Sequence, residues 1–374
     1  MTNSLKLITV VGTRPELIRL ACIIKAADRF FEHIFVHTGQ NWDRQLNDIF
    51  FEELDIRKPD YFLNVVGEDL GETMANVISK SYKLFKTVKP DCLLILGDTN
   101  SALCAISAKR LKIPIFHMEA GNRCFDLNVP EEINRKIVDH ISDINLPYTE
   151  NSRRYLIAEG IRGDHIFVTG TPLREVLDNY MPNIMASNIL SKLGIKHREY
   201  ILLSCHREEN LDIEKNFHEL LNTLDMICNT YQIPIIFSTH PRTRAKLLST
   251  NVKLNPLIIS CEPFGFFDYC NLQLNAKCVL SDSGSVSEEA SILNFPAVNF
   301  RTSTERPEAI DKANIIIGGI EADSVISSID MAINFYQEKR TIKPNDYCDT
   351  NISEKIVKII QSYTPIINRV VWYK

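Results

Sequence analysis

Two short stretches of the sequence gather charged side chains directly after apolar runs. "HMEAG" at 117–121 follows "IPIF", and "SCHREEN" at 204–210 follows "YILL". Short apolar runs of this kind are typical of strands that are buried on both faces of a parallel sheet. Ligands of such sheets bind beyond the carboxyl ends of the strands. We therefore expect the chemistry of this protein where these runs end in charge.

Carboxylates are the first group that this pattern selects. Asp98 in "LGDT" and Glu119 in "HMEAG" each follow an apolar run, and Glu131 stands beside Glu132 in "VPEEINRK". Burial at a strand end would raise the pKa of a carboxyl group towards the range that suits general acid and base catalysis. For Glu132 the pattern favours a carboxylate at a helix N-terminus.

Anion-binding residues are the second group. Arg14 in "VVGTRPELIR" stands between an expected strand and a helix that begins with capping-box spacing, where a phosphate is favoured. In "SDSGSVSEEAS" the small residues Ser283, Gly284 and Ser285 precede or open a helix and form a candidate phosphate cradle, with an ordinary loop as the alternative. Glu289 stands too far along the helix to cap its N-terminus. We expect its carboxylate to bind sugar hydroxyl groups, such as a ribose diol.

Further cations follow other expected strands. His206, His240 and Arg306, together with Arg14, would neutralise a diphosphate inside an acidic protein. Arg242 and Arg244 in "STHPRTR" are more typical of a solvated loop. The H-x-E spacing of "HMEAG" has no third ligand at a diagnostic distance, so we expect no metal. No G-x-G-x-x-G stretch and no P-loop occurs, and we therefore expect no NAD.

The elements that position these residues alternate between apolar runs and helical stretches, which predicts parallel sheets. We expect a doubly wound, Rossmann-like α/β domain at 1–175 and a second at 176–354, with a helix at about 355–374 that packs back on the first. The expected strands include 91–98, 113–119, 143–149, 166–170 and 199–206.

Composition limits the possible partners. The 374 residues are 45% hydrophobic and 24% charged with a net charge of −5, and Lys and Arg form no stripe, so we expect no nucleic-acid binding. No apolar run approaches the roughly 18 residues of a membrane span. We expect a cytoplasmic protein whose ten cysteines stay reduced.

Seven motifs in order resemble one family. "VVGTRPELIR", "LGDTNS", "HMEAGNR", "PEEINR", "SCHREEN", "SDSGSVSEEAS" and "TSTERPE" together resemble the non-hydrolysing UDP-N-acetylglucosamine 2-epimerases. The resemblance implies a GT-B fold of two Rossmann-like domains with the active site in the interdomain cleft. The stretch 110–150 is similar to the capsule and O-antigen branch, which forms UDP-N-acetyl-L-fucosamine from UDP-2-acetamido-2,6-dideoxy-L-talose.

The resemblance also implies roles for single residues. It makes Asp98, Glu119 and Glu131 the catalytic carboxylates and His206 a partner of the leaving diphosphate. The residues that it implies for UDP are Arg14, His206, Tyr269, Ser283, Gly284, Ser285, Glu289 and Arg306. Possible contacts to sugar or phosphate are Arg19, Arg123 and His240. Members that act on UDP-N-acetylglucosamine usually have Lys where this chain has Arg19, "EAGLR" where it has "EAGNR", and "HRRE" where it has "HREE".

Inversion at C2 of an acetamidohexose admits two routes. One oxidises a neighbouring carbon with NAD, and the other expels UDP as the C2 proton leaves and then adds UDP back. Without a dinucleotide fingerprint the sequence favours elimination, which needs a carboxylate on each face of C2. UDP-N-acetylglucosamine is the alternative substrate. A GT-B glycosyltransferase and a non-catalytic UDP-sugar sensor are the alternative classes. We expect a homodimer, because "FFEELDI" and the helices after "GETMANVISK" have apolar faces that could pair.

Overall fold

The computed structural model describes residues 4–40, 44–205, 207, 213–239, 241–250, 253–301, 304–340 and 342–374. The chain divides into two compact units. Unit 1 comprises Met1–Asn179 together with Cys348–Lys374, and unit 2 comprises Tyr180–Tyr347.

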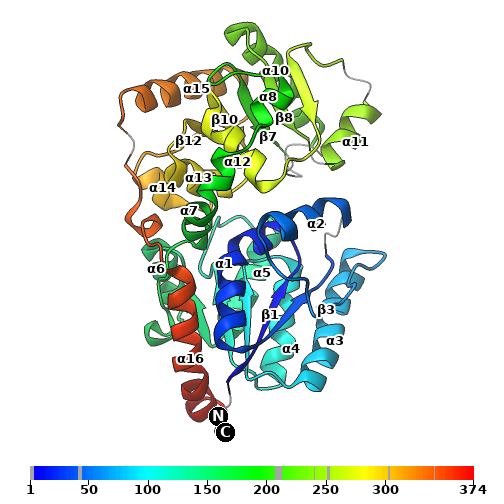
Figure 1. Ribbon diagram of the computed structural model, residues 1–374, viewed down its shortest axis with the longest axis vertical. Coiled ribbons are helices and arrows are strands. Elements are labelled where there is room, and N and C mark those ends of the chain that lie inside the picture. Colours follow the sequence, from blue (N-terminus) through cyan, green and yellow to red (C-terminus); the bar gives the residue numbers. More distant parts are fainter. Residues whose placement is uncertain are drawn as a thin grey trace. The chain divides into compact units, whose positions relative to one another are not determined.

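The sheet of unit 1 has six parallel strands in the order β3-β2-β1-β4-β5-β6 (Figure 1). The strands are β1 (Lys6–Val11), β2 (Glu32–His37), β3 (Tyr61–Phe62), β4 (Cys92–Leu96), β5 (Ile115–Met118) and β6 (Ile144–Leu146). This is the order of a doubly wound nucleotide-binding sheet. The order reverses between β1 and β4, so ligands are expected beyond the ends of these two strands.

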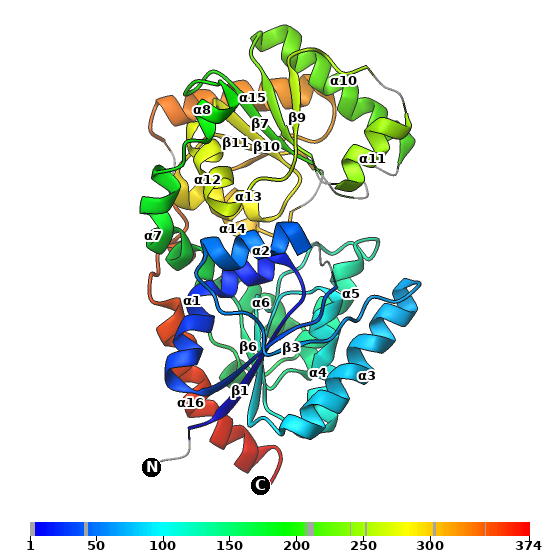
Figure 2. The ribbon, with the colours of Figure 1, turned by 45° about the vertical axis from the view of Figure 1, so that its right-hand side comes forward.

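Helices cover both faces of the unit 1 sheet. They are α1 (Arg14–Phe30), α2 (Arg44–Glu53), α3 (Leu70–Val88), α4 (Cys104–Arg110), α5 (Pro130–Ile141), α6 (Glu150–Ala158) and α16 (Ile352–Val370), and α7 (Pro172–Met185) leads out of the unit. In Figure 2, α1 and α16 lie side by side on one face, and α3, α4 and α5 lie on the other. Apolar residues of β1, β4 and β5 pack against α3 and α4 in one buried cluster.

Unit 2 repeats the same topology. Its strands are β7 (Ile201–Ser204), β8 (Ile235–Ser238), β9 (Ile258–Cys261), β10 (Cys278–Ser281), β11 (Ala297–Asn299) and β12 (Ile316–Ile317), all parallel, in the order β12-β11-β10-β7-β8-β9. Its helices are α8 (Ile189–Leu193), α10 (Glu214–Tyr231), α11 (Pro241–Ser249), α12 (Phe266–Asn275), α13 (Ser285–Leu293), α14 (Pro307–Asp311) and α15 (Ala322–Gln337). Side chains of α10 and α15 form the main core with the strands.

Two six-stranded parallel sheets with flanking helices confirm the predicted α/β fold class. One expected strand is wrong: 166–170 contributes only an isolated bridge between Asn145 and Ile166. The ten cysteines are all free thiols. Among the described residues, none of the helices is long and apolar enough to cross a membrane.

Candidate active site

The turn after β4 carries Asp98 where the strand order of unit 1 reverses. Gly97, the first residue of this turn, has a φ of +77°, which favours glycine. Its N–H donates to the Met118 carbonyl at the end of β5, over 3.0 Å. The turn is thereby tied to the strand that leads to Glu119.

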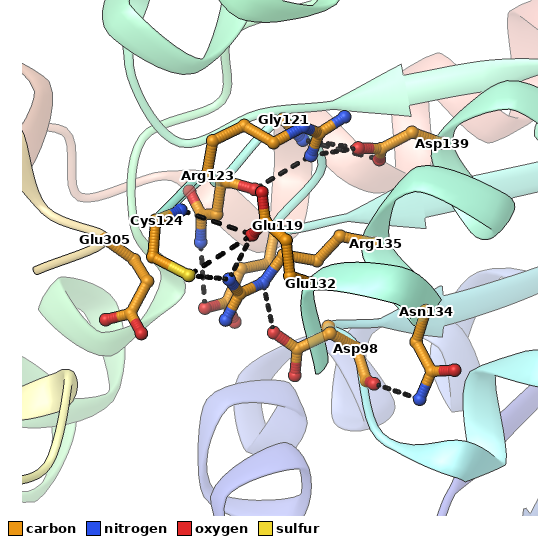
Figure 3. A network of polar contacts seen from close by, with 12 residues as sticks. Asp98, Glu119, Gly121, Arg123, Cys124, Glu132, Asn134, Arg135, Asp139 and Glu305 are labelled. Atoms are coloured by element: carbon orange, nitrogen blue, oxygen red, sulfur yellow. Dashed lines mark hydrogen bonds and ion pairs between the residues drawn. The ribbon is translucent and has the colours of Figure 1, made fainter. Parts of the chain in front are cut away.

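A guanidinium from α5 holds the Asp98 carboxylate. Nε of Arg135 lies 2.6 Å from Oδ2 of Asp98, and Nη1 of Arg135 lies 2.8 Å from Oε2 of Glu132 (Figure 3). Nδ2 of Asn134 donates to the backbone carbonyl of Asp98 over 2.9 Å. Because these three residues lie within one turn of α5, a single helix fixes both the side chain and the backbone of Asp98.

The two glutamates at the start of α5 occupy different environments. Glu132 is buried and accepts the backbone N–H groups of Cys124 and Phe125, at 3.2 and 3.3 Å. Burial opposes its ionisation, but the Cys124 N–H and the Arg135 guanidinium outweigh burial and hold the pKa of Glu132 below its usual value. Glu131, which the resemblance makes catalytic, is exposed beside this network.

Glu119 lies next to Gly97, in the turn after β5. Its φ of +64° is a conformation that non-glycine residues rarely adopt and that is enriched at functional sites. A Cβ built on Gly97 would lie 3.8 Å from Oε2 of Glu119. The Asn122 amide donates to Oε1 over 3.1 Å and the Tyr148 hydroxyl donates to Oε2 over 3.4 Å. Gly97 thus precedes Asp98 in the chain and lies near the Glu119 carboxylate.

Two arginines of α1 lie near these turns. The Arg19 guanidinium is buried, with its carbon over the ring of Tyr148 at 5.7 Å from the ring centroid, and the hydroxyl group of the same tyrosine donates to Glu119. Arg14 is half-buried at the start of α1 and lies 5.7 Å from the centroid of the Phe50 ring. Arg14 therefore stands directly after β1, on the sheet edge where the carboxylates gather.

Glu16 fills the N-terminal end of α1. Its carboxylate accepts the N–H groups of Gly12 and Thr13, at 2.5 and 3.2 Å, and the Thr99 hydroxyl group over 2.5 Å. Burial raises the pKa of Glu16 to about 7 against these hydrogen bonds, and the charge of Asp98 adds to the increase. In dinucleotide-binding folds the N–H groups of this turn bind a pyrophosphate. A pyrophosphate does not fit here while the Glu16 carboxylate occupies them.

Arg123 is enclosed by the carboxylates of Asp139 and Glu159. Its Nη1 lies 2.8 Å from Oδ2 of Asp139, and its Nε and Nη2 donate to Glu159 over 2.7 and 2.6 Å. The guanidinium has no exposed surface. A contact from Arg123 to a sugar or a phosphate would require one of these ion pairs to break.

The small-residue turn predicted in unit 2 lies at the end of β10 and opens α13. The Ser283 and Ser285 hydroxyl groups are 3.0 Å apart, and the Ser285 N–H donates to the Ser283 Oγ over 3.3 Å. Gly284 stands at the N-cap, where an added Cβ would lie 3.4 Å from Oε2 of Glu305. All three residues are half-buried at the terminus of a nine-residue helix, which is a suitable environment for a phosphate.

The other predicted UDP ligands of unit 2 adjoin α13. Glu289, one turn into α13, accepts from Nε2 of Gln273 over 2.5 Å. Burial and the nearby charge of Glu289 raise the pKa of Tyr269. Nε of Arg306 lies 2.8 Å from Oε1 of Glu288, on the same helix. The structure therefore brings six of the predicted residues around one helix, namely Tyr269, Ser283, Gly284, Ser285, Glu289 and Arg306.

The turn after β7 is joined to the turn after β10 through Asp282. The backbone N–H of Arg207 donates to Oδ2 of Asp282 over 2.9 Å, and the Arg207 Nε donates to the Asp282 carbonyl over 3.0 Å. The predicted contacts His206 and His240 lie outside the described residues. Among the residues that are described, no group of three or more His, Cys, Asp or Glu side chains is placed to hold a metal ion.

Several partners of the site were not singled out by sequence reasoning. These are Asn122, Arg135, Asp139 and Tyr148. One signal was present: Arg135 stands three residues after Glu132 in "PEEINR", a spacing at which a helix brings two side chains together. Tyr148 and Asp139 act on residues that are distant in sequence, and no local pattern indicates such pairs.

Comparisons with known proteins define the class of this chain. A family model described as UDP-N-acetylglucosamine 2-epimerase matches residues 24–361. The chain therefore belongs to the UDP-N-acetylglucosamine 2-epimerase family, and its relatives are isomerases. We expect proteins of this class to act through carboxylates that lie at the ends of such sheets.

Three individual proteins are instructive. The structure of a UDP-N-acetylglucosamine 2-epimerase from Rickettsia bellii is 47% identical, with a TM-score of 0.93 and full coverage of both chains. That of a UDP-GlcNAc 2-epimerase from Methanocaldococcus jannaschii, in complex with UDP-GlcNAc and UDP, is 35% identical over 95% of this chain and 99% of that one, with a TM-score of 0.89. A UDP-2,3-diacetamido-2,3-dideoxy-D-glucuronate 2-epimerase of Pseudomonas aeruginosa is 32% identical over 87% of this chain and 91% of its own.

Proposed function

We propose that this protein inverts C2 of a UDP-2-acetamidohexose by eliminating UDP and adding it back. The observation that carries the proposal is the pair of carboxylates at the carboxyl edge of the unit 1 sheet: Asp98 follows Gly97 in the chain, and Oε2 of Glu119 would lie 3.8 Å from a Cβ at Gly97. Membership of the epimerase family supports the same reaction. The relatives named above act on more than one UDP-sugar, so the family by itself leaves the hexose open.

The proposed reaction balances without an oxidant. A carboxylate removes the C2 proton while the bond between C1 and the diphosphate oxygen breaks, and UDP leaves with the bonding electron pair. The product of this step is a 2-acetamidoglycal. In the return step the UDP oxygen adds to C1 and C2 receives a proton on the opposite face. The same steps run in reverse, and no net oxidation occurs.

The environments of the carboxylates support a division of roles. Glu119 accepts from the Asn122 amide and from the Tyr148 hydroxyl group, whereas Asp98 is paired with the Arg135 guanidinium. We assign Glu119 and the exposed Glu131 to proton transfer. Asp98, which Arg135 holds in place, orients the substrate or tunes the other two.

Residues around α13 are proposed to hold UDP. The N-terminus of α13 at Ser283, Gly284 and Ser285 would bind phosphate oxygens, and Glu289 would bind the ribose diol with Tyr269 near the uracil. Arg14, His206 and Arg306 would neutralise the diphosphate as it leaves, which lowers the barrier of the elimination. We expect no NAD, because Glu16 occupies the N–H groups that a dinucleotide would use in unit 1.

The finer proposal concerns the hexose. We propose conversion of UDP-2-acetamido-2,6-dideoxy-L-talose to UDP-N-acetyl-L-fucosamine for capsule or O-antigen synthesis. Arg19, a charged residue beside the Tyr148–Glu119 pair, supports a pocket that differs from that of members with Lys at this place. Epimerisation between UDP-N-acetylglucosamine and UDP-N-acetylmannosamine is the alternative. We also propose a homodimer, for which Leu70 and Tyr82 on α3 provide exposed apolar surface.

Proton NMR in D2O tests the proposal. The protein is incubated with UDP-N-acetylglucosamine and, separately, with the UDP-2-acetamido-2,6-dideoxy-L-hexose, without added cofactor. The expected result is deuterium at C2 together with a new epimer, and the sugar that exchanges identifies the substrate. Retention of the C2 proton in both sugars would refute the epimerase assignment, and consumption of UDP-sugar only in the presence of an acceptor would favour a glycosyltransferase.

A further inference from the structure

His117 connects the two turns that carry Asp98 and Glu119. It lies in β5, two residues before Glu119, and it is 1% exposed. Its Nε2 lies 2.8 Å from the carbonyl oxygen of Gly97, the residue before Asp98. A carbonyl oxygen only accepts, so Nε2 carries a hydrogen and donates it.

A buried carboxylate faces the other side of the ring. Nδ1 of His117 lies 2.9 Å from Oδ1 of Asp139, whose side chain has no exposed surface. Burial by itself would raise the pKa of Asp139, but His117 and Arg123 hold it below its usual value. The Gly121 N–H also donates to Asp139, over 3.1 Å. Asp139 is therefore an ionised and fixed partner for the ring.

Alternating charges extend this arrangement away from the site. Asp139 pairs with Arg123 at 2.8 Å, and Arg123 pairs with Glu159 at 2.6 Å. All but Glu159 are essentially buried. Such a network is rigid, because displacement of any member leaves a buried charge without its partner.

We infer that His117 is a positioning residue for the epimerisation: through the Gly97 carbonyl it sets the distance between the carboxylates of Asp98 and Glu119. The inference rests on the proposed function, in which both carboxylates act on one sugar carbon. The other restraints on the Asp98 turn are the Gly97 N–H bond to the Met118 carbonyl and the contacts of Asn134 and Arg135 with Asp98. The His117 bond acts on the Gly97 carbonyl, and we expect its loss to let the turn shift relative to β5. A displacement of about 1 Å costs roughly a hundredfold in rate.

Two substitutions separate the two contacts of the ring. In His117→Asn the side-chain amide is short and reaches only the position of Nδ1, near Asp139. No donor then remains for the Gly97 carbonyl. In His117→Gln the longer amide replaces Nε2 and keeps that donor. We expect His117→Asn to lower kcat by about 10- to 100-fold with KM within about threefold of wild type, and His117→Gln to recover most of that loss. The readout is solvent deuterium incorporation at C2.

His33 provides the matched control. It is a buried histidine of the same sheet, with Nδ1 2.6 Å from Asp28 and Nε2 2.9 Å from Oγ1 of Thr9. His33→Asn should leave kcat unchanged whatever it does to thermal stability. Equal kcat values for His117→Asn and His117→Gln, or a kcat of His117→Asn within about threefold of wild type, would overturn the inference.

Two further variants make every outcome decisive. If His117→Asn does not fold, Asp139→Asn tests the same link, because it weakens the orientation of the ring and should lower kcat at nearly constant KM. A wild-type kcat for folded Asp139→Asn would then overturn the inference. Asp98→Asn is measured in parallel. Normal turnover of Asp98→Asn would remove the proposed role of Asp98, whereas an inactive Asp98→Asn beside a fully active His117→Asn would remove only the role of His117.

Discussion

Replacement of Arg135 by Met should destabilise unit 1 and slow the reaction. Arg135 bridges Glu132 and Asp98, whose side chains are 0% and 22% exposed. Removal of one partner of a buried ion pair typically costs about 3–5 kcal/mol, because the other charge stays buried. Asp98 is partly screened by solvent, so we expect a loss of about 3 kcal/mol in the free energy of unfolding. Turnover should fall about a hundredfold, since Asp98 loses the group that orients it.

The second substitution Glu132→Gln tests the reason for this loss. It removes the buried charge, so in the Arg135→Met background it should restore at least about half of the stability that Arg135→Met removes. Unfolding by urea is followed by tryptophan fluorescence, which reports on unit 1 alone because both tryptophans, Trp42 and Trp372, belong to it. Turnover is followed by deuterium exchange at C2.

An equivalent pair on α6 supplies the control. Arg153 and Glu150 have the same spacing of three residues, but their side chains are 35% and 51% exposed. Arg153→Met should cost no more than about 0.5 kcal/mol, as exposed pairs usually do. The reasoning fails if Arg135→Met and Arg153→Met have equal effects, or if Glu132→Gln adds a further loss to that of Arg135→Met.

Three other substitutions test neighbouring parts of the argument. Glu119→Gln should lower kcat at least about a hundredfold while UDP affinity, measured by calorimetry, stays normal, and near-normal turnover would remove Glu119 from the mechanism. Because burial raises the pKa of Glu16 from 4.5 to about 7, its protonation contributes stability below pH 4.5 that is lost as the pH rises through 7. This loss amounts to about 3 kcal/mol. The free energy of unfolding, measured with urea at pH 5 and at pH 8, should fall by this amount in wild type and not in Glu16→Gln. An equal change with pH in the two proteins would contradict the prediction. Glu289→Gln should weaken UDP binding about tenfold but hardly affect 2′-deoxy-UDP, and an equal loss for both ligands would argue against the ribose contact.

Sequence patterns predicted the central strands better than the edges of the sheets. β1, β4 and β5 are buried on both faces, so their apolar runs are continuous and easily recognised. β3 and β12 were not predicted, because each has only two residues and β3 is exposed on both. The stretch 166–170 has a strand-like composition, but only Ile166 meets a neighbouring strand.

At the site, the sequence analysis identified residues that stand at strand ends. It missed residues whose importance depends on the side chains that they contact. Asp98 and Glu119 stand at strand ends, which a pattern of apolar runs reveals. Glu131 is exposed and Glu132 is buried because of which face of α5 meets the loop at 124–125. No local signal in the sequence fixes that face. The positive φ of Glu119 and its contact with Tyr148 arise only from the packing of β5 against β6.

The two units place aspartates of different exposure at the same topological position. In each sheet the order reverses between the first and fourth strands of the unit, β1 with β4 and β7 with β10, and an aspartate follows the fourth strand. Asp98 keeps 22% of its side chain exposed beside Glu119, whereas Asp282 is fully buried and accepts from the Arg207 N–H. A buried, hydrogen-bonded aspartate is a structural anchor and an accessible one can meet a substrate. In unit 1 the Glu16 carboxylate accepts the N–H groups at the start of α1, whereas in unit 2 the turn before α13 carries the Ser283 and Ser285 hydroxyl groups in a helix N-terminal position that favours an anion.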